Sequence, residues 1–498
     1  MLLYYIVPLK HRWTVLLATS LLFFALVSTY LVAYVITTAI GVYCSARAID
    51  CRNCKEDLSP EKAKKYKRIN KAEVVITVLF NLTVLGVLKY FNFLGESFCS
   101  LLNLCGAGVT FRAIKFVLPI GISFYTLSAI GYLVDIHRKK YHAERNFFKI
   151  LLFLSFFPTI LEGPICRYDQ TGTLLSEGHR ADYKGITFGL QRILWGLFKK
   201  MIVADRIYLL VNAVSKEYEL YSGLVCLLFI LGYTIQLYAD FSGFMDIALG
   251  AAEVFGIKLP ENCRQPFFAS SAQEFWQRWH ITLGTWLKEY VFYSVALSPG
   301  MMKFGKRIKK KHKNHFTKTL PTIIALLAVW VCNGVWHGPK WTYIVYGLYY
   351  FVIISTGMLL EPLFKKLYEK IKLNPQCIGL KIWRHVRTLL IILVGETIFG
   401  APTLGAAFHI LGSLFRPYHG AAFSVALDWK EYIVLLCGLA LMLTVGILKE
   451  RKVDVREKIA GWALPLRWLV YASVFAFVII FGAYGSLYKS VPFIYGKF

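Results

Sequence analysis

The chain has 498 residues, of which 57% are hydrophobic and 17% are charged, and its mean hydropathy is +0.52. A soluble chain of this length carries about a quarter charged residues, and its apolar residues do not gather in long uninterrupted runs as they do here. These features exclude an ordinary soluble enzyme and predict an all-α polytopic membrane protein. The net charge of +28 comes from basic residues in short loops between apolar runs, which is typical of cytoplasmic loops and not of nucleic-acid binding.

The first apolar stretch, residues 13–46, predicts a membrane hairpin, because it is too long for a signal peptide and lacks an Ala-x-Ala cleavage site. Several later stretches are shorter than the ~20 residues of a full span, which predicts re-entrant or bundle-buried segments. We expect about 11 spans or part-spans in one integral-membrane domain, residues 1–498. The candidate spans are 13–28, 29–46, 74–94, 113–134, 147–161, 184–198, 220–240, 320–336, 341–360, 388–400, 430–448 and 466–486.

The loops rich in Lys and Arg predict the orientation, because positively charged loops stay in the cytoplasm. An even number of apolar segments separates most of them, as that rule requires, but three segments lie between 149 and 303, so one is re-entrant or one was missed. The last span then places the C-terminus outside. The basic loops are 47–71, 138–149, 303–318, 365–372 and 449–458.

Eleven cysteines are present, and most lie in or beside apolar runs, where a free thiol behaves as a small apolar group. Cys51 and Cys54 instead form a CxxC pair in a basic loop. A zinc site would need two more ligands at suitable spacing, and none is near in the sequence. We therefore expect a reduced pair without metal, with a metal or redox role as the alternative.

Polar groups at membrane depth are costly, so each is a functional candidate. His337 lies in a Trp336-His337-Gly338 motif between two apolar segments that both return to basic loops, which predicts a position on the outer side or at the floor of a cavity open to it. Neutral imidazole accepts a proton from a hydroxyl near pH 7, and Gly334 and Gly338 allow close backbone approach. The alternative is a structural histidine that hydrogen-bonds a neighbouring helix.

His280 is the second candidate. Trp276, Trp279, Leu283, Trp286 and Tyr290 recur at spacings of 3, 4, 3 and 4, which predicts one continuous helix with an apolar face that His280 flanks. Arg278, Lys288 and Glu289 lie on its other side, which is typical of a helix at an interface. The alternative is an aromatic-belt helix with a partly exposed histidine.

The remaining candidates are charged residues in apolar surroundings. Asp240 and Asp246 either line an ion path or cap the start of a helix, Glu162 and Arg167 form an internal ion pair or line a polar pore, and Glu396 is a further acid in an apolar segment. A phosphate-binding loop, a Gly-x-Ser-x-Gly elbow, a His-Glu-x-x-His motif and paired aspartates are absent from the sequence, which argues against an ATP-driven pump or an intramembrane metalloprotease.

Taken together, the motifs resemble the membrane-bound O-acyltransferases (MBOAT), in the branch of alginate O-acetylation, peptidoglycan O-acetylation and teichoic-acid D-alanylation proteins. The resemblance covers roughly 10–498. The core motifs lie at about 110–360, and further C-terminal spans at about 388–486 make the chain long for a D-alanylation member and favour O-acetylation. The matching stretches are 118–126, 156–158, 163–165, 167–168, 196–200, 204–206, 240–243, 259–262, 274–276, 278–280, 336–338 and 341, together with 492–495 and 498 at the end of the chain.

The resemblance implies a ring of helices around a central funnel, with His337 and His280 matching the two histidines of this branch as catalytic residues. It also implies an acyl group, here acetyl, taken from a cytoplasmic thioester such as acetyl-CoA or an acyl carrier protein for O-acetylation of a cell-wall or extracellular polysaccharide. A separate extracytoplasmic partner protein, a bacterial plasma membrane, and no bound metal or cofactor are expected. Substrate or funnel residues would be Trp336, Asn333, Asp240, Ser242, Arg278, Trp279, Glu162 and Arg167.

Two other functions remain open. The first is D-alanyl transfer from a carrier protein to teichoic acid. The second is of another class, a transporter or scaffold that uses Asp240, Asp246 and Glu396 as a polar path. Replacing His337 distinguishes the classes, because only an acyltransferase depends on that imidazole. The basic run 303–318 either attracts an anionic donor or only sets topology against anionic lipid.

Overall fold

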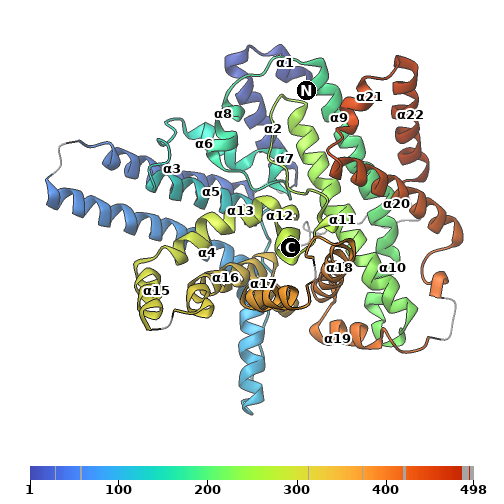
Figure 1. Ribbon diagram of the computed structural model, residues 1–498. Helices are drawn as coiled ribbons and strands as arrows, with labels where there is room; N and C mark the ends of the chain where they lie inside the picture. The colour runs from blue at the N-terminus through green and yellow to red at the C-terminus, as the bar shows by residue number, and fades with distance from the viewer. Residues whose placement is uncertain are drawn as a thin grey trace. The chain divides into compact units, whose positions relative to one another are not determined.

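The computed structural model describes residues 1–27, 30–56, 59–311, 313–372, 374–418, 422–484 and 493 (Figure 1). Within these ranges the regular secondary structure is helical, with one isolated antiparallel bridge between Cys263 and Trp279. In the described part of the chain, eight helices are long and apolar enough to cross a membrane. The prediction of an all-helical polytopic membrane protein is therefore confirmed, while the exact number of spans remains a prediction.

Some predicted spans are shorter or broken in the structure. The segment 113–134 becomes helical only at Ile122, because Pro119 donates no backbone hydrogen bond and Gly121 is left-handed, with φ of 67°. The segment 147–161 breaks at Phe156, since Pro158 cannot continue the preceding helix and opens a new first turn instead. The last predicted span, 466–486, runs past the described residues at 485 and 486.

Two compact units make up the chain. The first comprises Met1–Leu190 and Ala248–Pro260. Its core lies where α3 packs on α5 and α6, around buried Ile49, Leu133 and Ile136, and α2 with α3 forms the predicted first hairpin. The helices that lie wholly in this unit are α1 (Leu2–Ile6), α2 (Arg12–Val27), α3 (Val32–Asn53), α4 (Pro60–Leu104), α5 (Ile122–His137), α6 (Phe147–Ser155), α7 (Phe157–Ile160) and α8 (Tyr168–Ser176).

The second unit comprises Gln191–Ile247 and Glu261–Phe498. Two long helices pass between the units: α9 (Tyr183–Phe198), which continues through a π-helical segment (Lys199–Ala204) into α10 (Asp205–Lys216), and α11 (Leu224–Glu253). The prediction of a single domain is not tested by this division and stays a prediction.

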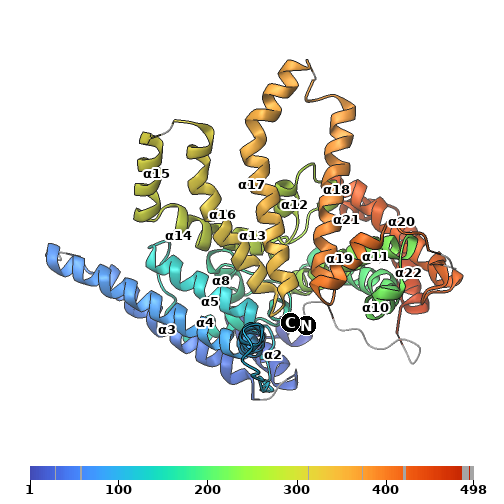
Figure 2. The same ribbon diagram turned by 90° about the horizontal axis from the view of Figure 1, so that it is seen from below.

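The remaining helices of the second unit include three long ones that follow one another in the sequence. α16 packs on α17, and α17 packs on α18, which runs antiparallel to it (Figure 2). The helices are α12 (Ala272–Arg278), α13 (Ile281–Leu287), α14 (Tyr293–Ala296), α15 (Pro299–Lys311), α16 (His315–His337), α17 (Trp341–Lys370), α18 (Ile378–Gly400), α19 (Leu404–Ser413), α20 (Trp429–Glu450), α21 (Val455–Ala460) and α22 (Leu464–Phe481).

Candidate active site

His337 is the last residue of α16, and small residues hold that helix end against α17. A Cβ atom added at Gly334 would lie 2.6 Å from the Tyr343 carbonyl oxygen, and one added at Gly347 would lie 2.4 Å from the Trp330 carbonyl oxygen. Only glycine permits this approach of two backbones. The predicted close approach at Gly334 is confirmed, and it fixes where α16 delivers the His337 imidazole.

Aromatic side chains surround His337. The ring centroid of His337 lies 5.0 Å from that of Phe399, 5.1 Å from Trp336 and 6.0 Å from Tyr346. Its side chain is only 2% exposed. The imidazole is therefore enclosed by aromatic side chains, and its predicted place on the outer side of the membrane stays a prediction.

The chain around His280 breaks where one continuous helix was predicted. α12 ends at Arg278 and α13 begins at Ile281, because His280 adopts the left-handed conformation with φ of 47°. Left-handed backbone cannot continue a right-handed helix. The spacing of 3, 4, 3 and 4 was misleading, since the stripe is divided between α12, the break at 279–280, α13 and the π-helical segment Lys288–Phe292.

Asn262, in an adjacent extended segment, stabilises the interruption between α12 and α13 through hydrogen bonds. The Ile281 backbone N–H donates to the Asn262 carbonyl (3.0 Å), and the Asn262 side-chain oxygen accepts from the Thr282 N–H (2.9 Å) and hydroxyl (3.0 Å). These bonds satisfy N–H groups at the start of α13, where a helix has no internal partner for them. Asn262 is a positioning residue that the periodicity argument did not find.

The two histidines lie together in the second unit. Their ring centroids are 6.4 Å apart, and Trp336 contacts both, at 5.4 Å from His280 and 5.1 Å from His337. His280 is 1% exposed, and burial lowers the pKa of its imidazole, which is therefore neutral at pH 7. We call His280, His337, Trp336, Tyr346 and Phe399 the histidine cluster.

Further polar groups border the histidine cluster. Asn333 lies one turn before His337 in α16, and its buried side-chain oxygen has no hydrogen-bond partner among the described residues. The same holds, within the described part of the chain, for the buried indole N–H groups of Trp276 and Trp330, whose rings are 4.9 Å apart. An orphaned acceptor and orphaned donors are groups that a polar substrate can satisfy.

Glu396 of α18 is buried next to this cluster. Its Oε1 atom accepts a hydrogen bond of 3.2 Å from the Tyr346 hydroxyl, and Tyr346 in turn contacts His337. The other carboxylate oxygen, Oε2, is buried without a hydrogen-bond partner among the described residues. The structure thus brings one predicted intramembrane acid to the histidine cluster through a tyrosine.

Asp240 and Asp246 belong to a different set of contacts. Lys200 donates to Asp240 (2.6 Å), while Asp246 accepts from Lys199 (2.6 Å) and Arg192 (2.8 Å). Both acids lie in the interior of α11, so the prediction that they cap the start of a helix is wrong. The reason is that α11 begins at Leu224, and these two carboxylates instead pair with cations of α9 and of the π-helical segment.

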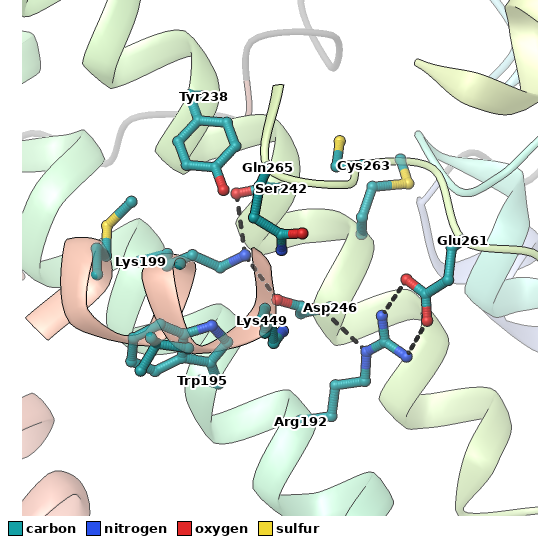
Figure 3. Close-up of a pocket in the computed structure, with 14 residues that line it drawn as sticks. Arg192, Trp195, Lys199, Tyr238, Ser242, Asp246, Glu261, Cys263, Gln265 and Lys449 are labelled. Atoms are coloured by element: carbon teal, nitrogen blue, oxygen red, sulfur yellow. Dashed lines mark hydrogen bonds and ion pairs between the residues drawn. The ribbon is translucent and has the colours of Figure 1, made fainter. Parts of the chain in front are cut away.

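Ser242 joins these contacts by accepting a hydrogen bond of 2.9 Å from Lys199 (Figure 3). The two buried lysines were not found as partners from the sequence, although they end an apolar run as a charged pair. We call this set the ion-pair cluster; its members are Arg192, Lys199, Lys200, Asp240, Ser242 and Asp246.

A basic cavity of about 510 Å³ adjoins the ion-pair cluster between α9, the 261–265 segment and α20 to α22. Apolar side chains of Leu441, Val445 and Val470 line part of it. Basic side chains outnumber acidic ones around it: Arg192, Arg264, Lys449, Lys452 and Arg456 against Asp246, Glu261 and Asp454.

The other predicted site residues have structural contacts. Arg278 forms ion pairs with Glu274 (2.7 Å) and Glu450 (2.8 Å), and the backbone of Trp279 forms the bridge to Cys263. Trp279 also contacts Phe241 of α11, which lies 4.8 Å from the His280 ring. Arg278 therefore supports the segment that carries His280.

Glu162 and Arg167 lie in the first unit. Glu162 is buried just after α7, and Arg167 is the residue that precedes the first turn of α8. Their predicted part in a funnel remains a prediction.

Comparison with known proteins identifies the family of the chain. The model of the membrane-bound O-acyltransferase family matches residues 137–399, which include both histidines. The chain is 29% identical to a probable alginate O-acetylase of Azotobacter vinelandii, over 83% of this chain and 74% of that protein, and it spans 61% of another relative of the same name. A peptidoglycan O-acetyltransferase of Helicobacter pylori is 30% identical over 58% of this chain and 55% of its own length. A teichoic acid D-alanyltransferase of Bacillus subtilis is 30% identical over 58% and 69%.

The family match covers more than half of the chain and agrees with its apolar helices and with the two histidine motifs. The resemblance drawn from the motifs is thereby confirmed. The chain belongs to the membrane-bound O-acyltransferase family and is an integral-membrane O-acyltransferase.

Proposed function

We propose that the protein transfers an acetyl group from a cytoplasmic thioester donor across a bacterial plasma membrane, for O-acetylation of a cell-wall or extracellular polysaccharide. The observation that carries this proposal is the 6.4 Å between the ring centroids of His280 and His337, which both lie in the region that the membrane-bound O-acyltransferase family matches. A pair of imidazoles beside one reacting centre suits the transfer of an acyl group from sulfur to oxygen.

In the proposed reaction, His337 takes the proton of an acceptor hydroxyl while the oxygen attacks the thioester carbonyl carbon. The negative charge that develops on the carbonyl oxygen is stabilised by donors such as the indole N–H groups of Trp276 and Trp330. The carbon–sulfur bond then breaks, and the leaving thiolate receives the proton from the His337 imidazolium. His280 positions the donor, held in place by its left-handed backbone and by Asn262.

Access to the site requires a movement of the aromatic side chains. Because His280 and His337 are 1% and 2% exposed, an acyl chain reaches them only when neighbouring rings shift. Such closure keeps water away from the thioester and prevents its hydrolysis.

The donor is anionic whether it is acetyl-CoA or a carrier-protein thioester. The basic cavity beside the ion-pair cluster is lined by residues of the 449–458 loop, which the positive-inside rule assigns to the cytoplasm. Attraction of the donor's phosphates to Lys449, Lys452 and Arg456 supports entry there. We further propose that a separate extracytoplasmic partner passes the acetyl group to the polymer.

A comparison of strains tests the function. A deletion strain is complemented with the wild type, His337→Ala or the control His385→Ala, whose ring is exposed and hydrogen-bonds the Lys381 carbonyl of its own helix. Loss of general base catalysis costs about 10²–10⁴-fold. We expect His337→Ala to abolish alkali-released acetate from purified envelope polysaccharide at equal protein level, while His385→Ala restores it.

The same hydrolysate separates the alternatives. Release of D-alanine instead of acetate would favour the D-alanyl transferase, which the Bacillus subtilis relative represents. Equal ester content with wild type and His337→Ala, together with loss of function in Asp240→Asn and Glu396→Gln, would favour the transporter and contradict the proposed catalysis.

A further inference from the structure

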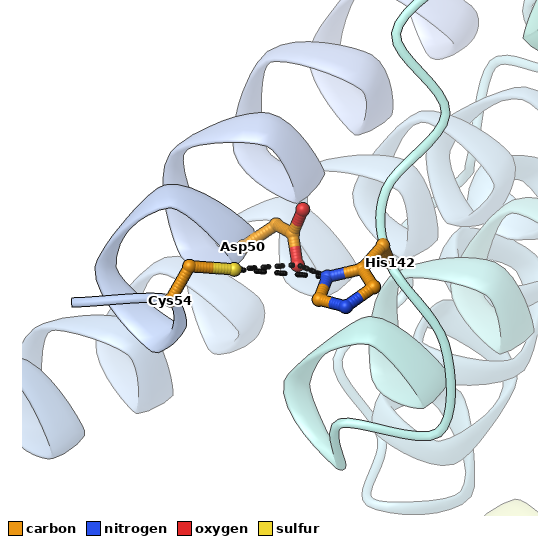
Figure 4. A group of neighbouring side chains, drawn as sticks. All are labelled: Asp50, Cys54 and His142. Atoms are coloured by element: carbon orange, nitrogen blue, oxygen red, sulfur yellow. Dashed lines mark hydrogen bonds and ion pairs between the residues drawn. The ribbon is translucent and has the colours of Figure 1, made fainter. Parts of the chain in front are cut away.

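Three side chains of ligand type meet in the first unit, away from the residues assigned to acyl transfer. Asp50 lies in the last turn of α3, Cys54 follows the end of that helix, and His142 comes from the segment between α5 and α6 (Figure 4). Asp50 and Cys54 are four positions apart, so they share one face of the helix end. His142 approaches that face from a different part of the chain.

The separations between the three ligand atoms match those around one metal ion. Cys54 Sγ lies 3.6 Å from His142 Nδ1 and 3.8 Å from Asp50 Oδ1, and His142 Nδ1 lies 3.1 Å from Asp50 Oδ1. Zinc bonds of about 2.0–2.3 Å in tetrahedral geometry place sulfur, nitrogen and oxygen ligands about 3.3–3.6 Å from one another. A single ion therefore fits among these atoms with shifts of a few tenths of an ångström.

We propose that Asp50, Cys54 and His142 bind a zinc ion, with water as the fourth ligand. A thiolate and an imidazole select Zn²⁺ over Mg²⁺ and Ca²⁺, which prefer oxygen ligands only. On binding, the zinc–sulfur bond replaces the sulfur–hydrogen bond of Cys54, and the proton passes to water. The thiolate and the Asp50 carboxylate together balance the charge of the ion.

The proposed ion would tie the end of α3 to the segment after α5. Further hydrogen bonds hold α3 against this part of the chain, from the Tyr43 hydroxyl to the Arg145 carbonyl (2.9 Å) and from the Asn53 amide to the carbonyl of Ile136 in α5 (3.4 Å). Cys54 and the His142 side chain are exposed, so the ion exchanges with water on the side that the basic loops assign to the cytoplasm. The site would stabilise this junction and respond to the supply of zinc.

Alkylation of the wild-type chain tests the site without a mutation. The detergent-purified full chain is stripped with a chelator, treated with N-ethylmaleimide with or without Zn²⁺, and analysed by peptide mass spectrometry. We expect Zn²⁺ to slow labelling of Cys54 at least tenfold, with Mg²⁺ without effect. Cys51 is an exposed cysteine nearby that does not belong to the group, so it is the internal control.

Variants then identify the ligands. We expect the wild type and Cys51→Ser to bind one equivalent of Zn²⁺ by mass spectrometric metal analysis, and Cys54→Ser and His142→Ala to bind it at least tenfold more weakly. Because both replaced side chains are exposed, their zinc-free melting temperatures should equal that of the wild type. Equal labelling of Cys54 with and without Zn²⁺, full binding by His142→Ala, or equal loss in Cys51→Ser would overturn the site.

Discussion

Two buried clusters of polar side chains border helix α11. They differ in how their polar groups are compensated away from water. In the ion-pair cluster, each carboxylate of α11 faces a cation of α9 or of the π-helical segment, as with Lys200 and Asp240 at 2.6 Å. In the histidine cluster, Phe241 of the same helix contacts the neutral imidazole of His280, and most of the neighbouring side chains are aromatic rings.

The difference shows which polar groups support the fold and which are available for chemistry. A buried charge needs a fixed partner, because leaving one uncompensated costs several kcal/mol. Because of that requirement, the side chains of the ion-pair cluster are held in fixed pairs, and the cluster supports the fold. A neutral imidazole needs no counter-charge, so it can remain among aromatic rings and still accept a proton when substrate arrives.

Removing the carboxylate that pairs with two cations should have the largest effect on stability. Asp246→Asn leaves Lys199 and Arg192 without their shared anion, although Arg192 keeps its bidentate contact with Glu261 at 2.7 and 2.8 Å. Breaking a buried pair from one side costs about 3–5 kcal/mol. We expect a marked fall in the unfolding temperature of the protein in detergent.

The matched control removes the opposite partner. Lys199→Met leaves Asp246 paired with Arg192, so its loss of stability should be clearly smaller than that of Asp246→Asn. The double variant with Asp246→Asn and Lys199→Met should recover part of the lost stability, because it leaves fewer buried charges without a partner. Equal unfolding temperatures for Asp246→Asn and the wild type would show that this cluster is not a scaffold.

The second prediction concerns the break at His280. His280→Asn keeps a residue that tolerates the left-handed conformation but removes the imidazole, whereas His280→Ala also disfavours the backbone by about 1 kcal/mol. We expect both variants to lose about 10²-fold in acetyl transfer, as for a misplaced reactant. Only His280→Ala should also unfold at a lower temperature.

Measuring both quantities on the same preparations separates the roles. If His280→Asn transfers acetyl groups as fast as the wild type, the imidazole only shapes the backbone, and the histidine cluster would reduce to His337. A parallel loss of activity and stability in His280→Asn would make His280 a structural residue, comparable with the ion-pair cluster.

The sequence predicted the helical membrane fold and both histidines, because long apolar runs and short motifs are local properties. It did not predict the break at His280, since the aromatic spacing there is continuous and the left-handed residue is imposed by Asn262 from another segment. Nor did it find His142 beside Cys54, because these residues are 88 positions apart. Contacts that depend on tertiary packing leave no periodic pattern in a single chain.

A glycine at the contact between α16 and α17 provides the last test of the contrast between the two clusters. The histidine cluster is built largely of aromatic rings, and the position of its His337 depends on the close approach of α16 and α17 at Gly334. Gly334→Ala would place a methyl group 2.6 Å from the Tyr343 carbonyl oxygen, and overpacking of this kind costs about 1–3 kcal/mol. Because the displaced helix end carries His337, acetyl transfer should fall together with the unfolding temperature.

Gly357 in the same helix pair is the matched control, since a Cβ atom there meets nothing within 4 Å. Replacing it with Ala should leave activity unchanged and raise helix stability by up to about 1 kcal/mol. If Gly334→Ala behaved like Gly357→Ala, the position of His337 would not depend on helix contact. Contacts between aromatic side chains would then hold the histidine cluster in place. It would differ from the ion-pair cluster in its side-chain contacts and not in the packing of its backbone.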